Sequence, residues 1–187
     1  SMLALAGEDG LAAMTIVLYA QFVYTAVSMG FATSAAPVIS YHSGSGNTRY
    51  LQRLFRYCLG AIGLIMAAMM AAAMLFARPL IGLFTPPGGA VFELALHGFW
   101  VFLWNFLFAG FNIFSSSLFT ALSNGAVSAL ISFLRTLVFV VGSILLLPRL
   151  LGLDGIWLAI PVAEGLTFLI AAALVIRYGR EPYHYLR

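Results

Sequence analysis

The sequence contains no lysine and few charged residues of any kind. Charged side chains make up 8% of its 187 residues, whereas hydrophobic residues make up 63%. Soluble globular domains carry roughly a quarter charged residues, because their surfaces must be solvated by water. The composition therefore excludes a soluble globular protein. It indicates an integral membrane protein whose main surroundings are the lipid bilayer.

The scarcity of cysteine and histidine excludes several kinds of site. Cys58 is the single cysteine, so the chain can form neither an intrachain disulfide nor a cysteine zinc site. His42, His97 and His184 are scattered between a loop, a helix start and the tail. Enzymes need a nucleophile with its base, or a metal, in one place. We therefore expect no metal, no cofactor and no enzymatic activity.

The net charge of +3 does not indicate nucleic-acid binding. Such binding needs basic residues clustered on one water-facing surface. The nine basic residues are all arginines and lie mostly near the ends of apolar segments. The positive-inside rule of membrane proteins accounts for that position.

Five segments are apolar and long enough to cross the hydrocarbon core of a bilayer, which takes about 20 helical residues. They predict an all-α membrane protein, a single helical domain over residues 1–187. Arg78-Pro79 is expected to end the second segment. The five spans are expected at about residues 11–40, 55–77, 94–122, 126–148 and 155–176.

The arginines also predict an orientation. With five spans the two termini lie on opposite sides of the membrane. If the polar turn after the first span is cytoplasmic, six arginines are inside and two are outside, as the positive-inside rule requires. The C-terminus is then cytoplasmic. The inside set is Arg49, Arg53, Arg56, Arg177, Arg180 and Arg187, and the outside set is Arg78 and Arg149.

Arg135 and Glu164 are the two formal charges deep inside predicted spans. Each lies nine residues into its span, counted from Ala126 and from Gly155, which is roughly 13 Å from opposite faces of the membrane. In a core about 30 Å thick, both side chains are then at nearly the same level. We expect them to face the protein interior and to pair. The pair either couples transport to a cation or only fixes helix packing.

The third segment combines aromatic and polar side chains. Trp100 and Trp104 are four residues apart, so they are expected to share a helix face. They either line an aromatic cavity that holds a cation or face the lipid, which is the commoner role. Asn105, Asn112 and Ser116 need polar partners within the membrane, and we assign them to the same candidate substrate cavity.

Short motifs that occur in order along the chain indicate a family. Together they resemble the C-terminal half of multidrug and toxic compound extrusion (MATE) transporters, and the resemblance extends from about Gly7 to Arg177. The motifs are Gly30-Phe31, Ala36-Pro37-Val38-Ile39-Ser40-Tyr41, Gly44-Ser45-Gly46-Asn47, Ala121-Leu122-Ser123-Asn124-Gly125, Leu134-Arg135, Leu147-Pro148, Gly152-Leu153-Asp154-Gly155-Ile156-Trp157 and Pro161-Val162-Ala163-Glu164.

The resemblance implies a transporter of twelve helices in two lobes, in which a proton or sodium gradient drives export of small cationic or amphipathic molecules. This chain looks like helices eight to twelve, so a missing N-terminal lobe is its expected partner. The expected location is the bacterial inner membrane. Glu164 matches an acidic position in the twelfth helix of related members, whereas the span equivalent to the tenth helix has no carboxylate within its apolar body.

Two other functions compete with a partial antiporter lobe. The chain is alternatively a half-size carrier that acts as a dimer, although five spans do not give the six-plus-six arrangement of the family. The second alternative is a noncatalytic membrane scaffold, in which the Arg135–Glu164 pair serves only to pack the helices.

Overall fold

The computed structural model describes residues 2–186, and all of its regular elements are helices. The expected all-α fold class is confirmed. In chain order the elements are α1 (Met2–Gly44), α2 (Thr48–Gly82), α3 (Ala90–Phe102), α4 (Trp104–Ala121), α5 (Gly125–Phe133), the π-helix η1 (Leu134–Phe139), α6 (Val140–Leu151) and α7 (Leu153–Arg180).

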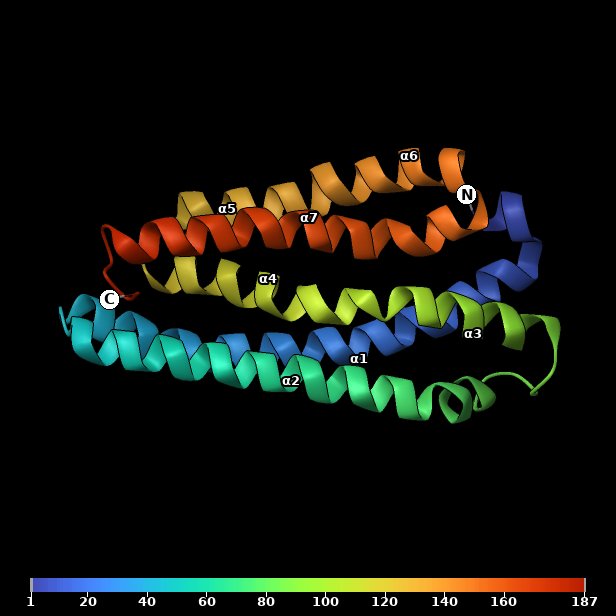
Figure 1. Cartoon of the computed structure of the whole chain (residues 1–187), viewed down its shortest axis with the longest axis horizontal. Coiled ribbons are helices and arrows are strands. Elements are labelled where there is room, and N and C mark those ends of the chain that lie inside the picture. The colour runs from blue at the N-terminus through green and yellow to red at the C-terminus, as the bar shows by residue number, and fades with distance from the viewer. Residues whose placement is uncertain (1, 187) are drawn as a thin grey trace.

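These helices provide up to five membrane spans. Four helical stretches are long and apolar enough to cross a bilayer, namely α1, α2, α7 and the continuous stretch from α5 to α6. The fifth is the pair α3 and α4, which is bent by 49°. The termini lie at opposite ends of the bundle (Figure 1).

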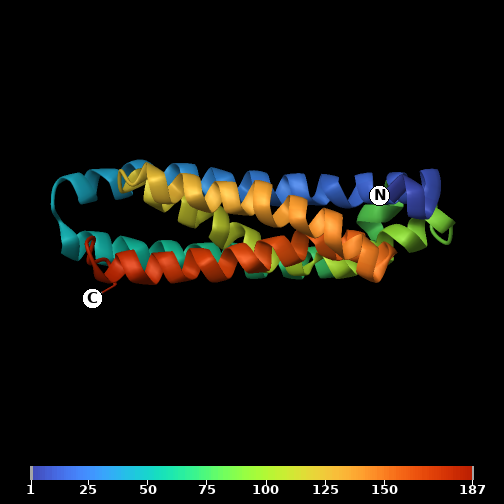
Figure 2. The ribbon, with the colours of Figure 1, turned by 90° about the horizontal axis from the view of Figure 1, so that it is seen from above.

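The bent pair α3 and α4 forms the centre of the bundle. It packs against α1 and α2 on one side and against α7 on the other, while α6 packs on α7. Figures 1 and 2 show the long helices running along one common axis. Among the described residues α1 does not pack directly on α5 or η1, so these two walls leave a groove above α4.

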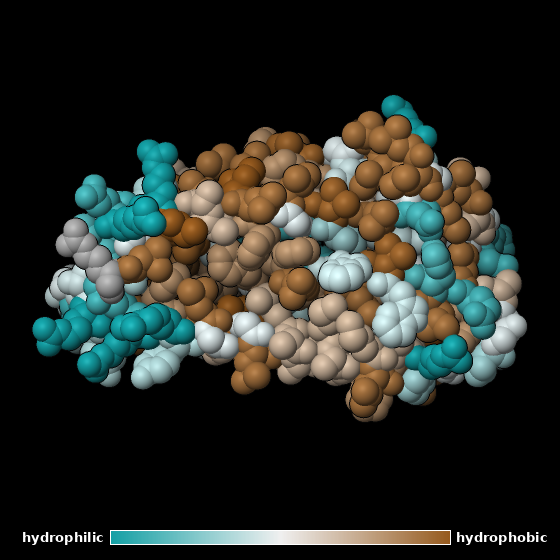
Figure 3. Space-filling view, viewed as in Figure 1, coloured by the Kyte–Doolittle hydropathy of each residue, from teal (hydrophilic) through white to brown (hydrophobic). Residues whose placement is uncertain are grey.

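The surface is divided into bands along the helix axes. Hydrophobic side chains cover the middle of the molecule, and hydrophilic side chains gather at both ends (Figure 3). Large apolar side chains such as those of Phe22 and Leu64 are exposed in the middle of their helices. Such a large exposed apolar surface is unfavourable in water, whereas the hydrocarbon of a bilayer solvates it.

The ends of several helices follow from local sequence. Asn47 and Asn124 cap α2 and α5, because their side-chain oxygens accept hydrogen bonds from the backbone N–H groups of Tyr50 and Val127. The expected end of the second span at Arg78-Pro79 is wrong. Helix α2 continues to Gly82 with Pro79 inside it, in the last turn, where a proline interrupts little further helix.

The third span is not the continuous helix expected from the sequence. It breaks at Leu103, and just beyond the break the hydroxyl of Tyr24 reaches it from α1. This hydroxyl donates a hydrogen bond to the carbonyl of Phe106 at 2.6 Å and accepts one from the N–H of Gly110 at 3.2 Å. A regular helix would pair those two backbone groups with each other. A side chain inserted into the hydrogen-bond ladder is an established cause of helix bending.

Gly110 makes this contact possible. A Cβ atom at this position would lie 2.8 Å from the Tyr24 hydroxyl and 2.9 Å from a carbon of Met66. The absence of a side chain therefore lets α1 and α2 approach α4 closely, as small residues do between membrane helices.

We predict that Tyr24→Phe destabilises the bundle, because it leaves the Phe106 carbonyl and the Gly110 N–H facing an apolar ring. The expected loss is about 1–3 kcal/mol. Tyr19→Phe is the matched control, because Tyr19 lies on the same helix but is exposed and has its ring stacked on Phe84. Thermal unfolding in detergent measures both, and equal melting temperatures for the two variants would contradict the role of the hydroxyl.

Candidate functional site

A polar groove runs between α1 on one side and α5 and η1 on the other, with α4 as its floor. Its volume is about 420 Å³. We call it the polar groove, because hydroxyl, amide and guanidinium groups supply much of its lining. The polar residues that line it are Thr25, Thr33, Asn112, Ser116, Ser117, Thr120, Ser132 and Arg135.

Glu164 lies behind one wall of the polar groove, on α7, and its side chain is only 3% exposed. Its two carboxylate oxygens have different partners. Oε1 accepts a hydrogen bond from Nε of Arg135 at 2.7 Å, and Oε2 accepts one from Nδ2 of Asn112 at 2.7 Å. The same amide nitrogen lies 2.9 Å from the backbone carbonyl of Glu164. The expected pairing of Arg135 with Glu164 is thus confirmed, and Asn112 joins it.

Arg135 connects this buried carboxylate with the groove. Its side chain is 25% exposed and lines the groove. Among residues 2–186 its guanidinium has one hydrogen-bond partner, Glu164, through Nε. A charge pair at this depth needs such close geometry to offset the loss of hydration.

Arg135 lies on the π-helical turn η1, between α5 and α6. A π-helical turn holds more residues than an α-helical turn, and such turns occur mostly as single-turn bulges in α-helices, frequently at functional sites. Because of the extra residue, the side chains of α6 are rotated about the helix axis relative to those of α5. The turn therefore places the guanidinium toward α7 while the rest of the helix continues along the bundle.

A cluster of four hydroxyl groups joins α4 to α5 beside Arg135. Oγ of Ser116 lies 3.0 Å from Oγ of Ser128 and 2.9 Å from Oγ of Ser132. Oγ1 of Thr120 lies 2.8 Å from Oγ of Ser128. Each of the four hydroxyls thus has a protein partner.

The structure separates the residues that the sequence assigned to one cavity. Asn112 and Ser116 line the polar groove, whereas Trp100 and Trp104 do not. The two tryptophans are 47% and 56% exposed, and the helix break at Leu103 falls between them. Asn105 is fully buried, and its amide has no hydrogen-bond partner among the described residues. Their assignment to a substrate cavity stays a prediction.

Sequence reasoning missed Tyr24, Ser128 and Ser132. The two serines had a usable signal, because Ser128, Ser132 and Arg135 follow the spacing of one helix face. Tyr24 had none, because its partners are 82 and 86 residues away in the sequence.

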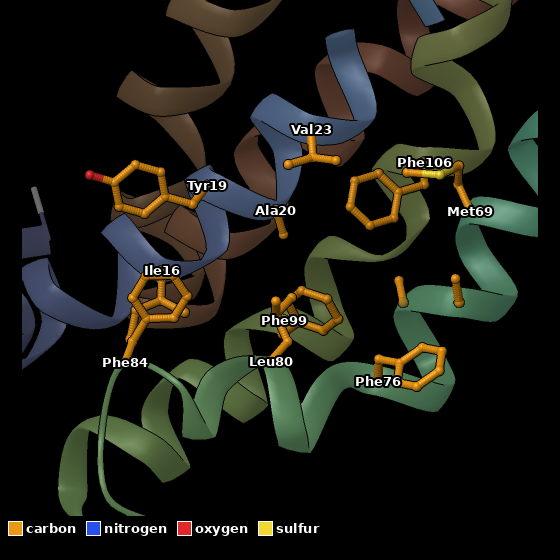
Figure 4. Close-up of a pocket in the computed structure, with 12 residues that line it drawn as sticks. Ile16, Tyr19, Ala20, Val23, Met69, Phe76, Leu80, Phe84, Phe99 and Phe106 are labelled. Carbon is orange, nitrogen blue, oxygen red and sulfur yellow. The ribbon is translucent and has the colours of Figure 1, made fainter. Parts of the chain in front are cut away.

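A second pocket, of about 280 Å³, lies between α1, α2 and the α3–α4 pair. Figure 4 shows that its lining is almost entirely carbon, with aliphatic and aromatic side chains such as Ile16, Phe76 and Phe106 around the space. The hydroxyl of Tyr19 points away from it. This pocket offers neither a charge nor a hydrogen-bonding partner, so it cannot orient a polar ligand as the polar groove can.

His97 lies at the end of the bundle where α6 meets α7. Its Nε2 is 2.7 Å from Oδ1 of Asp154, and both side chains are more than half exposed. The pair connects α3 to the start of α7. Among residues 2–186 no three histidine, cysteine, aspartate or glutamate side chains lie close enough together to hold a metal ion.

The sequence model of the MatE family matches residues 1–145. No curated protein matches the chain. Solved structures with the same fold are known in two conformations. An outward-facing multidrug resistance MATE family transporter of the MOP superfamily is 25% identical, with a TM-score of 0.82. An inward-facing one is 23% identical, with a TM-score of 0.81.

In both cases the match covers 99% of this chain but only 41% and 42% of the transporter. A MOP superfamily transporter from Pyrococcus furiosus, described as having a binding pocket of reverse polarity, is 22% identical with a TM-score of 0.83, over 99% of this chain and 41% of that one. The chain thus spans about two fifths of these proteins. It belongs to the MatE family of membrane transporters, and its fold is that of most of the C-terminal lobe.

Proposed function

We propose that this chain forms one wall of the export pathway of a cation-coupled antiporter, with Glu164 and Arg135 as the coupling residues. The observation that carries the proposal is the buried Glu164 carboxylate, which a guanidinium connects to a polar groove in the middle of a membrane span. Ionisable groups at that depth are costly and are retained mainly where ions or substrates pass.

One proton is enough to change this site. While Glu164 is ionised, its carboxylate neutralises Arg135. Protonation of Glu164 removes the counterion and leaves the guanidinium charged in a medium of low dielectric constant. The Arg135 guanidinium is then stabilised only by water or by a new partner. We expect the side chain to move into the polar groove, which it already lines. The two protonation states therefore favour two positions of the η1 side of the groove.

The geometry favours a proton over sodium as the coupling ion. Sodium needs several oxygen ligands that are free to coordinate it. Both oxygens of Glu164 already accept hydrogen bonds from Arg135 and Asn112, and a sodium ion would have to displace a guanidinium from the same carboxylate. A proton needs only one of the two oxygens.

The proposed substrates are small amphipathic molecules. The polar groove offers hydroxyl and amide groups beside apolar side chains such as Met29 and Ile131, which suits molecules with both kinds of surface. A cationic substrate would need its counter-charge from elsewhere in the transporter, because Glu164 is buried behind Arg135.

The proposed partner is the N-terminal lobe of the transporter. Alternating access in such carriers arises mainly from rigid-body rocking of one repeat against the other. The chain resembles the outward-facing and the inward-facing transporter about equally, with TM-scores of 0.82 and 0.81. Such similarity supports a lobe that keeps its shape while its position changes.

We also propose a bacterial inner membrane location with a cytoplasmic C-terminus. Arg49, Arg53 and Arg56 start α2 at the end of the bundle where α7 finishes with Arg177 and Arg180. The opposite end carries most of the carboxylates. This asymmetry fits the positive-inside rule. A half-size carrier and a noncatalytic scaffold are the alternatives.

We predict that Glu164→Gln abolishes coupled export when the chain is co-expressed with a matching N-terminal lobe. The amide keeps the shape but cannot ionise, so we expect at least about a tenfold lower rate and a flat pH dependence. Export of a fluorescent dye from everted membrane vesicles measures this. Glu93→Gln is the control, because Glu93 is exposed at the start of α3. An unchanged rate in the Glu164 variant would favour the scaffold.

We predict that export depends on the pH gradient and not on sodium. Replacing sodium by choline in the same vesicles is expected to change the rate by less than about twofold, whereas nigericin is expected to stop export by collapsing the pH gradient. A rate that falls with sodium removal and persists without a pH gradient would show that sodium is the coupling ion.

A further inference from the structure

Among the described residues, the arginine-rich end of the bundle carries five arginines and one carboxylate, that of Glu181. Among residues 2–186 the two ion pairs are Arg135 with Glu164 and His97 with Asp154, and neither lies at this end. Figure 3 shows hydrophilic side chains gathered there next to the hydrophobic middle band. The arginines concerned are all exposed: Arg49, Arg53, Arg56, Arg177 and Arg180.

One part of this end is hollowed. The last turns of α7 line an open hollow of about 950 Å³. Arg177 and Arg180 contribute two guanidinium groups to it, and Glu181 contributes one carboxylate. Ala173 and Ile176 form its apolar part on the side nearer the middle of the membrane. The charged part thus lies toward the end of the bundle and the apolar part toward its middle, the same order as the headgroup and the acyl chains of a phospholipid.

The apolar part continues toward the middle of the membrane along the same face of α7. Leu166, Leu169, Ala173 and Ile176 follow each other at helical spacings of three or four residues, and all are exposed. Leu166 is also one wall of an apolar furrow of about 250 Å³ between α7 and the η1–α6 stretch. The distance from Arg177 to Leu166 along the helix is roughly 16 Å, close to half the thickness of the hydrocarbon core.

We propose that this face of α7 is a binding site for one anionic phospholipid of the phosphatidylglycerol type. The phosphate lies between the guanidinium groups of Arg177 and Arg180, which suit phosphate oxygens in charge and geometry. One acyl chain follows the apolar stripe to the furrow at Leu166. The site rests on membrane insertion and does not depend on the direction or coupling of transport.

The charge of the hollow selects the headgroup. Two arginines and one glutamate leave a single net positive charge, which matches the single negative charge of phosphatidylglycerol. Its uncharged glycerol hydroxyls can donate hydrogen bonds to the Glu181 carboxylate. A zwitterionic headgroup brings no net charge to balance the second guanidinium. Arg53 and Arg56 on α2 carry the same charge but are not among the residues that line this hollow, so we expect them to attract anionic lipid only through the surface potential.

The test is lipid binding by the purified protein in a neutral detergent, followed by native mass spectrometry. Phosphatidylglycerol, phosphatidylethanolamine and phosphatidylcholine with identical acyl chains are titrated separately. We expect one phosphatidylglycerol to bind at least about tenfold more tightly than the other two lipids. In Arg177→Gln with Arg180→Gln, we expect its affinity to fall roughly 10- to 30-fold.

Two further double variants control this experiment. Arg53→Gln with Arg56→Gln removes the same charge from the same end, and a change below about threefold is expected. Arg177→Lys with Arg180→Lys keeps the charge without the bidentate geometry, and an intermediate loss is expected. Equal losses from the α2 and α7 double variants would overturn the site and leave only a general surface attraction. Tighter binding of phosphatidylethanolamine that Glu181→Gln abolishes would overturn the proposed headgroup.

Discussion

A polar or charged group inside the hydrocarbon of a membrane is costly unless it has a partner in the protein, because no water is there to hydrate it. Many of the polar contacts between the helices of this bundle supply such partners. Glu164 takes its partners from Arg135 and Asn112. The Tyr24 hydroxyl binds the backbone of α4, and four further hydroxyls pair between α4 and α5. These contacts hold together helices whose apolar surfaces have little preference between each other and lipid.

The same constraint separates two kinds of hollow on the molecule. The pocket between α1 and α2 is apolar and suits packing or hydrocarbon. The polar groove between α1 and α5 has the guanidinium of Arg135 on its wall and the Glu164 carboxylate directly behind it. In the function that we propose, one proton on this carboxylate gives the lobe two electrostatic states. The further hollow, at the end of α7, is lined by Arg177, Arg180 and Glu181, and there we propose that a lipid phosphate binds.

The membrane class and the spans follow from sequence because hydrophobic length and charge punctuation act locally. The same local reasoning fails where an element depends on a distant one. The break between α3 and α4 lies near the hydroxyl of Tyr24, which belongs to another span. The hydropathy of residues 94–122 therefore could not predict the break. The continuation of α2 through Pro79 is the smaller failure, since a proline in the last turn interrupts little further helix.

For the site, the sequence by itself determined that Arg135 and Glu164 lie at one level, because helix rise and bilayer thickness convert residue counts into depth. Only the tertiary structure decided which atoms meet. The orientation of each helix about its axis depends on packing with all its neighbours, and the π-helical turn η1 shifts that orientation at Arg135. The packing of α4 with its own neighbours places Asn112 and Ser116 in the lining of the polar groove, while Trp100 and Trp104 lie outside it.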